Sequence, residues 1–176
     1  MKRIARFALF GAVGFGVGGI IGAIMWGSHG SPGTGQTFIS LALIGAMGGG
    51  SLGLALQGWR KAGVAALAGA IGFSITTFIG LVIQLAIWGL EPPPYFAHLF
   101  IGIIIGTLFG ATLGLALRGW RAAGLLALAG AIGFGLYFQA ILDMVFEVSS
   151  AKSFGIWGAI AGAVLGVALG IPKKDE

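Results

Sequence analysis

A row of polar side chains is the part of this sequence best equipped for chemistry. Gln139, Asp143 and Glu147 are spaced at i, i+4 and i+8, so they would form one polar stripe on a helix. Gln84 lies at a similar depth in an earlier apolar segment, and His98 follows the next loop. Polar groups inside apolar segments often line a path for solutes or ions. The five residues predict a polar entrance, and the alternative is that they only solvate helix ends.

No recognisable catalytic or metal-binding pattern accompanies this stripe. The chain has no cysteine and two histidines, and it contains no HExxH, no GK[ST] phosphate loop and no Ser/His/Asp grouping. No ionisable residue occupies the middle of an apolar segment, which argues against a proton relay or a voltage sensor. We therefore expect no enzyme, no metal site and no cofactor.

The composition indicates what must position these side chains. Of the 176 residues, 57% are hydrophobic and 9% are charged. Soluble domains average about 25% charged residues, so this chain cannot build a surface that faces water. A net charge of +5 could suggest nucleic acid in a soluble protein. Here we expect the lipid bilayer as the partner, and no nucleic acid.

Six apolar runs have the length of about 20 residues that crosses a bilayer. They predict an all-α integral membrane protein, a six-transmembrane-helix bundle that forms a single membrane domain over residues 1–176. The predicted spans are Phe7–Trp26, Thr37–Leu56, Ala62–Trp88, Tyr95–Leu117, Ala122–Val145 and Phe154–Ile171.

Basic residues predict the orientation of these spans. Of the ten lysines and arginines, only Lys152 falls on one side of the predicted membrane. Positive charge accumulates on the cytoplasmic side, so we expect a multi-pass protein of the cytoplasmic (inner) membrane with both termini in the cytoplasm. The nine residues assigned to that side are Lys2, Arg3, Arg6, Arg60, Lys61, Arg118, Arg121, Lys173 and Lys174.

The sequence repeats a two-helix unit three times. Leu52–Phe73 aligns with Leu113–Phe134 without a gap, and the two segments differ at four of 22 positions. Shorter echoes, GA[VI]GF and LG[LV]AL, extend the pattern over three repeats, approximately residues 3–58, 61–119 and 122–171, before a short tail at 172–176. Two spans per unit return the chain to the same side. Three parallel hairpins with pseudo-three-fold symmetry are therefore expected.

Glycines at every fourth position predict how the helices associate. Such a stripe leaves a smooth helix face, and close packing over small residues drives association in lipid. We expect the even-numbered spans to pack closely, either against their own hairpin partners or around the pseudo-axis. A pore lining is the alternative. The stripes of the fourth and sixth spans are Gly102, Gly106, Gly110, Gly114, Gly158, Gly162, Gly166 and Gly170.

Two copies of a Gly-Trp-Arg turn connect predicted spans on the basic side. Gly58 and Gly119 are the first residues of these turns, and glycine there favours a left-handed helix end. Tryptophan is typical of the headgroup layer, and arginine reaches lipid phosphates. We expect an interface role for these turns, with docking of a cytoplasmic protein as the alternative. The residues concerned are Trp59, Arg60, Trp120 and Arg121.

These features leave two classes of function open. The first is a structural or accessory membrane subunit, with another membrane protein or a cytoplasmic subunit as its partner. The second is a small-solute channel or transporter component with an outward-facing polar entrance. In its size and six spans the chain is similar to the substrate-binding components of energy-coupling-factor vitamin transporters. That resemblance implies a vitamin-type substrate and a partner in the membrane.

Overall fold

The structure, a computed structural model, describes residues 2–27, 34–56, 58–89, 94–145 and 151–171. These residues form six α-helices, and the described part of the chain contains no strand. The helices are α1 (Lys2–Gly27), α2 (Thr34–Ala55), α3 (Trp59–Trp88), α4 (Tyr95–Arg118), α5 (Trp120–Val145) and α6 (Ala151–Gly170).

The prediction of six apolar helices is confirmed. Each helix is long and apolar enough to cross a membrane. The observed bounds are wider at several ends, since α1 already begins at Lys2 and α6 at Ala151. The longest helix, α3, has 30 residues and ends where Gly89 takes a positive φ of 65°. The backbone N–H of Gly89 donates to the carbonyl of Leu85 at 2.9 Å, which closes the last turn.

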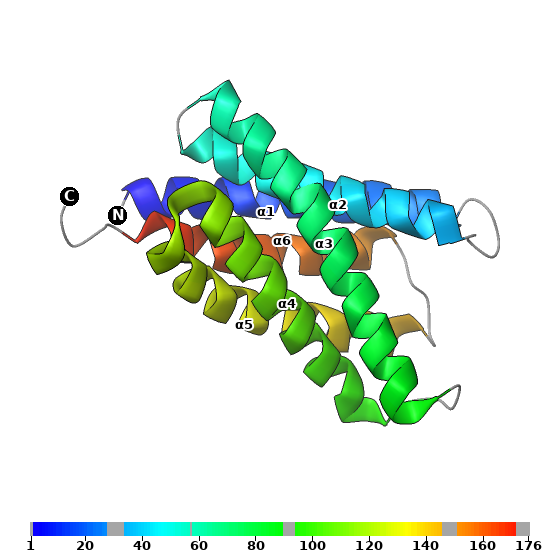
Figure 1. The fold of residues 1–176 in the computed structure, drawn as a ribbon. Helices are drawn as coiled ribbons and strands as arrows, with labels where there is room; N and C mark the ends of the chain where they lie inside the picture. Colours follow the sequence, from blue (N-terminus) through cyan, green and yellow to red (C-terminus); the bar gives the residue numbers. More distant parts are fainter. Residues whose placement is uncertain (1, 28–33, 57, 90–93, 146–150, 172–176) are drawn as a thin grey trace.

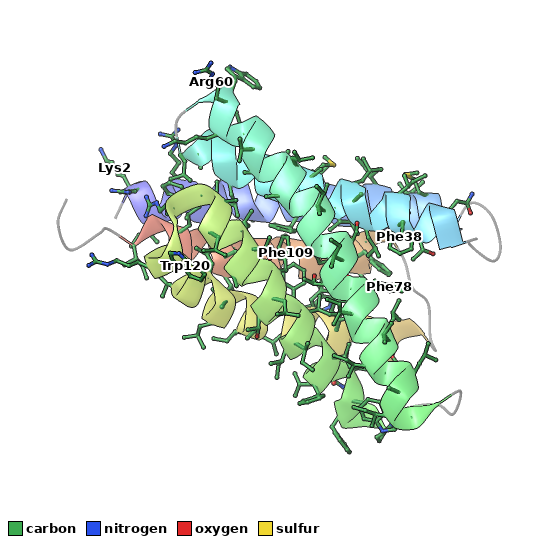
Figure 2. All side chains as sticks on the ribbon, in the orientation of Figure 1. Lys2, Phe38, Arg60, Phe78, Phe109 and Trp120 are labelled. Carbon is green, nitrogen blue, oxygen red and sulfur yellow. The ribbon has the colours of Figure 1, made fainter. Side chains whose placement is uncertain are left out.

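The helices are arranged as a ring in chain order. Each helix packs against its neighbours in the sequence, and α6 packs against α1. The α2–α3 and α4–α5 connections lie at the same end of the bundle as the start of α1 and the end of α6 (Figure 1). We call this the turn end and the opposite one the loop end. Lys2, Arg60 and Trp120 all lie toward the turn end (Figure 2).

Three helix pairs make the closest backbone contacts at glycine. Gly45 of α2 faces the carbonyl of Gly69 of α3, and Gly106 of α4 faces that of Gly130 of α5. A Cβ added to any of the eight striped glycines of α4 and α6 would meet backbone of the neighbouring helix within 3.0 Å. Those two stripes therefore lie in helix contacts along their whole length.

The partner in these contacts is not the hairpin partner, which was one of the two arrangements expected. The stripes of α2 and α4 pack against the helix that follows each of them, α3 and α5, and the stripe of α6 packs against α1. The helices in these pairs are therefore not the first and second spans of one repeat. In α2–α3 and α4–α5 a short turn leads from the stripe to its partner. The glycines of α1 serve two neighbours, since Gly14 faces Ser51 of α2 while Gly11 faces Gly162 of α6.

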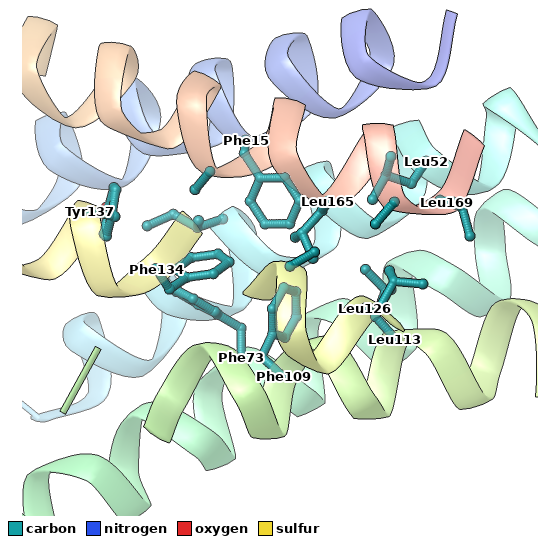
Figure 3. Packing of buried hydrophobic residues seen from close by; sticks show 14 of the residues in the cluster. Phe15, Leu52, Phe73, Phe109, Leu113, Leu126, Phe134, Tyr137, Leu165 and Leu169 are labelled. Carbon is teal, nitrogen blue, oxygen red and sulfur yellow. The ribbon is translucent and has the colours of Figure 1, made fainter. Parts of the chain in front are cut away.

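Two apolar layers fill the centre of the ring (Figure 3). Four fully buried phenylalanines meet in the middle, with ring centroids 5.2–5.8 Å apart and mostly edge-to-face geometry. Toward the turn end follows a layer of fully buried leucines. The phenylalanines are Phe15, Phe73, Phe109 and Phe134, and the leucines are Leu52, Leu113, Leu126, Leu165 and Leu169.

The glycine contacts predict a sharp contrast between two alanine substitutions. Gly106→Ala should destabilise the protein by about 1–3 kcal/mol, because the new methyl group meets the backbone of α5 and forces the helices apart. Gly124→Ala is the matched control, since a Cβ there has no neighbour within 4 Å. It should be neutral or stabilising, because alanine favours a helix by about 1 kcal/mol over glycine. Unfolding in mixed detergent micelles measures both, and equal effects would contradict the packing argument.

Candidate functional site

A cavity of about 300 Å³ lies in the half of the bundle that faces the loop end. All six helices contribute to its lining, so it is central to the ring. Its deepest wall includes Phe73, Ile44 and Ile105, next to the phenylalanine layer. Thr37, Gln84 and His98 line it closer to the loop end. The cavity therefore reaches from the helix ends to the middle of the bundle, where the aromatic layer closes it.

Two buried hydroxyl groups in the cavity wall have no hydrogen-bond partner among the described residues. Ser40 of α2 is 3% exposed and Thr77 of α3 is 6% exposed, and both line the cavity. Several other hydroxyls are satisfied by their own helix: Ser51 donates to the carbonyl of Gly48 at 2.8 Å, and Thr107 to that of Ile103 at 2.7 Å. Ser74 of α3 is also unpaired among the described residues, but it does not line the cavity. Leaving a buried polar group unpaired costs about 1–3 kcal/mol. The wall thus carries hydrogen-bonding capacity that the protein itself does not use.

The glycine register explains why the cavity opens beside α2 and α3. One turn beyond its closest contact, α4 presents Gly102 to Phe134 and Phe138 of α5, and α6 presents Gly158 to Phe15 of α1. Each of these pairs therefore has one helix without a side chain at this level. The corresponding residues of α2 and α3 are Leu41 and Thr77, and neither is glycine. Figure 1 shows α3 diverging from α2 toward the loop end.

A second hollow, of about 340 Å³, lies between α3 and α4 and has a different character. Exposed apolar residues such as Leu67 and Ile71 line it. Its two hydroxyls are satisfied, since Thr76 donates to the carbonyl of Phe73 at 3.3 Å and Thr112 to that of Leu108 at 2.8 Å. Nothing in this second hollow selects a polar partner, so lipid chains are sufficient to cover it.

Only part of the predicted polar entrance comes together at the cavity. Gln84 and His98 both line it. Gln139 is half-buried on α5 and does not belong to the cavity lining. Asp143 belongs to α5, but its side chain lies outside the described residues, as does Glu147 altogether. Whether the stripe Gln139–Asp143–Glu147 reaches the cavity therefore stays a prediction.

The Gly-Trp-Arg turns lie at the turn end, where the sequence placed them. Gly58 and Gly119 have positive φ values of 127° and 81°. Their ψ values of 148° and −167° are extended, so these glycines take a conformation that other residues rarely reach rather than the left-handed helical one. Trp59 and Trp120, the first residues of α3 and α5, are each 84% exposed. Arg60 and Arg121 are also exposed.

Ser40 and Thr77 were not among the predicted site residues. Serine and threonine commonly bond to their own helix, so their presence in a span is weak evidence for a site. A signal was present in the comparison of the two best copies, because Ser40 corresponds to Ile101 and Thr77 to Phe138 at a shift of 61 residues. At both positions a buried hydroxyl in one copy replaces a larger apolar side chain in the other.

Within the described residues, no three histidine, cysteine, aspartate or glutamate side chains are grouped as they would be around a metal ion. Comparison with protein-family models, with curated proteins and with solved structures gives no match for this chain. The described residues are all-helical, and six helices long and apolar enough to span a membrane are consistent with a polytopic membrane protein. Any finer assignment depends on the site itself.

The unpaired hydroxyl predicts a stabilising substitution. Thr77→Val keeps the shape of the side chain and removes a buried group without a partner, so the unliganded protein should gain about 1–3 kcal/mol of stability. Thr112→Val is the control, because it removes a hydroxyl that is already bonded to Leu108 on an exposed face, and it should be neutral or slightly destabilising. Thermal unfolding in detergent compares the two. A destabilised Thr77→Val protein would show that the hydroxyl has a partner after all.

Proposed function

We propose that this chain is a six-span protein of the cytoplasmic membrane that binds a small, uncharged molecule in the cavity at the loop end. The observation that carries the proposal is the cavity itself, which all six helices line and whose wall holds two unpaired hydroxyls. Of the two open classes of function, this one corresponds to a solute-binding transport component. It is a binding protein rather than an enzyme, and it needs no cofactor.

The finer architecture that we propose is a bundle of three parallel repeats held by glycine zippers. Equivalent contacts in the three close pairs support it: Gly45 with Gly69, Gly106 with Gly130, and Gly162 with Gly11. The phenylalanines of the three GA[VI]GF segments also converge in one layer, at Phe15, Phe73 and Phe134. Both facts are what approximate three-fold symmetry about a central axis would produce.

The proposed orientation places the turn end in the cytoplasm and the cavity toward the outside. Exposed basic residues at the turn end support it, among them Lys2, Arg60 and Arg121. Within the described residues, Lys152 is the one basic residue of the loop end. Accumulation of lysine and arginine on one side is the strongest general determinant of membrane topology.

Binding is favoured over free passage because the axis is filled beyond the cavity. A solute that left the cavity toward the turn end would meet the four phenylalanines and then the leucine layer. Phe109, Leu113 and Leu165 are each 0% exposed, so no room for a solute remains beside them. An open channel would need a continuous polar path along the axis. In this bundle, apolar side chains close the axis between the cavity and the turn end. Transport would therefore require a second conformation or a partner.

The lining also determines the charge of the proposed ligand. The described residues that line the cavity include no aspartate, glutamate, lysine or arginine. An ion brought into an apolar site without an opposite charge is strongly disfavoured. Ser40, Thr77 and Gln84 offer hydrogen bonds without formal charge. An uncharged molecule with a few polar atoms is what such a wall accommodates.

An accessory subunit is the second candidate function, and one observation favours it. Trp59 and Trp120 contribute little to packing within the bundle, since each is 84% exposed. With Arg60 and Arg121 beside them, the two turns offer matched apolar and basic groups to a cytoplasmic partner. Lipid headgroups would use the same groups, so a binding partner is needed to separate this role from anchoring.

Filling the cavity predicts loss of binding. Thr77→Phe places at this position of α3 the residue that α5 carries at the corresponding position, Phe138. The ring would occupy the cavity, so binding of 2-naphthol as a small uncharged probe should weaken at least tenfold. Ile75→Phe is the matched control, since Ile75 is 52% exposed on the same helix and lies outside this cavity. Fluorescence titration in lipid nanodiscs measures both.

An equal affinity for 2-naphthol in the Thr77→Phe and Ile75→Phe proteins would exclude the cavity as the binding site. A measurable flux of potassium ions or glycerol through the reconstituted wild-type protein would contradict the closed axis and favour a channel.

The orientation can be tested directly, because the chain contains no cysteine. Single cysteines at Arg60 and Arg121 should react with a membrane-impermeant maleimide only when the cytoplasmic face is accessible. Lys152→Cys should react from the opposite face in intact cells. Labelling of the two turns from opposite faces would refute the parallel arrangement of repeats.

A further inference from the structure

We propose that the cavity takes a lipophilic molecule from the surrounding bilayer, through the seam between α2 and α3, and binds its single polar end at Ser40 and Thr77. This inference rests on the proposed function and adds a class of ligand and a route. The molecule would be an uncharged one with an aromatic or branched hydrocarbon body and one hydroxyl or carbonyl group.

The walls define the body of the ligand. Apart from its few polar groups, the cavity is lined by apolar side chains, including four aromatic ones: Phe73, Tyr137, Phe138 and Phe154. Tyr137 meets Phe134, Phe138 and Phe154 edge to face, with ring centroids 5.5–6.4 Å apart. Aromatic walls in this arrangement favour another ring or a branched apolar body. The volume of about 300 Å³ is roughly twice that of an apolar cavity of about 150 Å³ that takes up benzene.

The hydroxyls define the polar end. Each can donate one hydrogen bond and accept others, so a ligand hydroxyl or carbonyl would be matched by either. Ser40 comes from α2 and Thr77 from α3, which places the unused hydrogen-bonding groups on the two helices that form the seam. A molecule that enters between these helices therefore meets both groups on its way into the cavity.

One aromatic pair covers the seam on its lipid side. Phe38 of α2 and Phe78 of α3 lie with ring centroids 5.9 Å apart, and they are 37% and 50% exposed (Figure 2). Each follows directly after a lining residue, Thr37 and Thr77 respectively. Two partly exposed rings can change rotamer without breaking a backbone contact, so this pair can open at low cost.

The other two close helix pairs offer no such opening at the same level. In α4–α5 a Cβ on Gly102 would meet the backbone of Phe134, and in α6–α1 a Cβ on Gly19 would meet that of Phe154. Backbones in contact leave no space for a ligand to pass. Of the three close pairs, α2–α3 is therefore the one where side chains alone separate cavity from lipid at this level.

Cross-linking the seam tests the route. In a Phe38→Cys/Phe78→Cys protein, a short bifunctional methanethiosulfonate would join the two helices. Release of bound 2-naphthol into excess lipid vesicles, followed by its fluorescence, should slow at least tenfold and recover on reduction. The control is Leu99→Cys/Gln139→Cys, the corresponding positions of α4 and α5. The same reagent there should leave the release rate unchanged.

The outcomes separate the inference from the function on which it depends. If the wild-type protein binds 2-naphthol and the cross-link, verified by mass spectrometry, leaves release unchanged, the lateral route is wrong while the proposed function stands. If the wild-type protein does not bind the probe, the proposed function fails as well. A Phe38→Ala/Phe78→Ala protein provides a second reading, since it should release the probe faster than the wild type, and an unchanged rate would also overturn the route.

The ligand class is tested with a matched pair of probes. 2-Naphthol should bind about fivefold more tightly than naphthalene in the wild-type protein, as expected for one net hydrogen bond. Ser40→Ala/Thr77→Val should remove this preference while it retains naphthalene binding. An equal preference in the wild-type and double-substituted proteins would show that these hydroxyls do not hold the polar end.

Discussion

Contact between helix backbones at glycine is the constraint on which this structure depends. In lipid, burying an apolar side chain between helices gains little, because the hydrocarbon around it is just as apolar. Helices must instead approach closely enough for dispersion forces to act along their backbones. Gly45 with Gly69, Gly106 with Gly130, and Gly162 with Gly11 provide that approach. Since every one of these contacts excludes a Cβ, each fixes both the distance and the register of its pair.

The same constraint creates the cavity where it is not met. One turn beyond their closest contacts, the α4–α5 pair keeps Gly102 and the α6–α1 pair keeps Gly158. The α2–α3 pair has Leu41 and Thr77 there, so two side chains must fit between the helices. A cavity lined by aromatic rings and two unpaired hydroxyls results. Where one of the three close pairs has side chains in place of glycine, a cavity thus takes the place of a sealed contact.

Much of the fold could be predicted from the sequence, because span length and composition dominate in a membrane protein. The six helices follow from apolar runs, and the turns at Trp59 and Trp120 follow from a repeated motif. The partner of each glycine stripe could not be predicted, since a stripe is equally smooth toward either neighbour. Ser40 could not be distinguished from Ser51 by type, because only their surroundings show that one bonds to its own helix and the other does not.

The distribution of close contacts also determines which motions are inexpensive. A path toward the turn end would have to displace the buried leucine layer. Where it separated α4 from α5 or α6 from α1, it would also break contacts in which glycines such as Gly110 and Gly166 lie against the neighbouring backbone. Interdigitated contacts of this kind resist gradual deformation, because dispersion falls steeply with distance. At the loop end, Phe38 and Phe78 meet only through their rings. Rotamer changes there disturb no glycine contact, so of the three close pairs α2–α3 is the one that can separate at the loop end without breaking one.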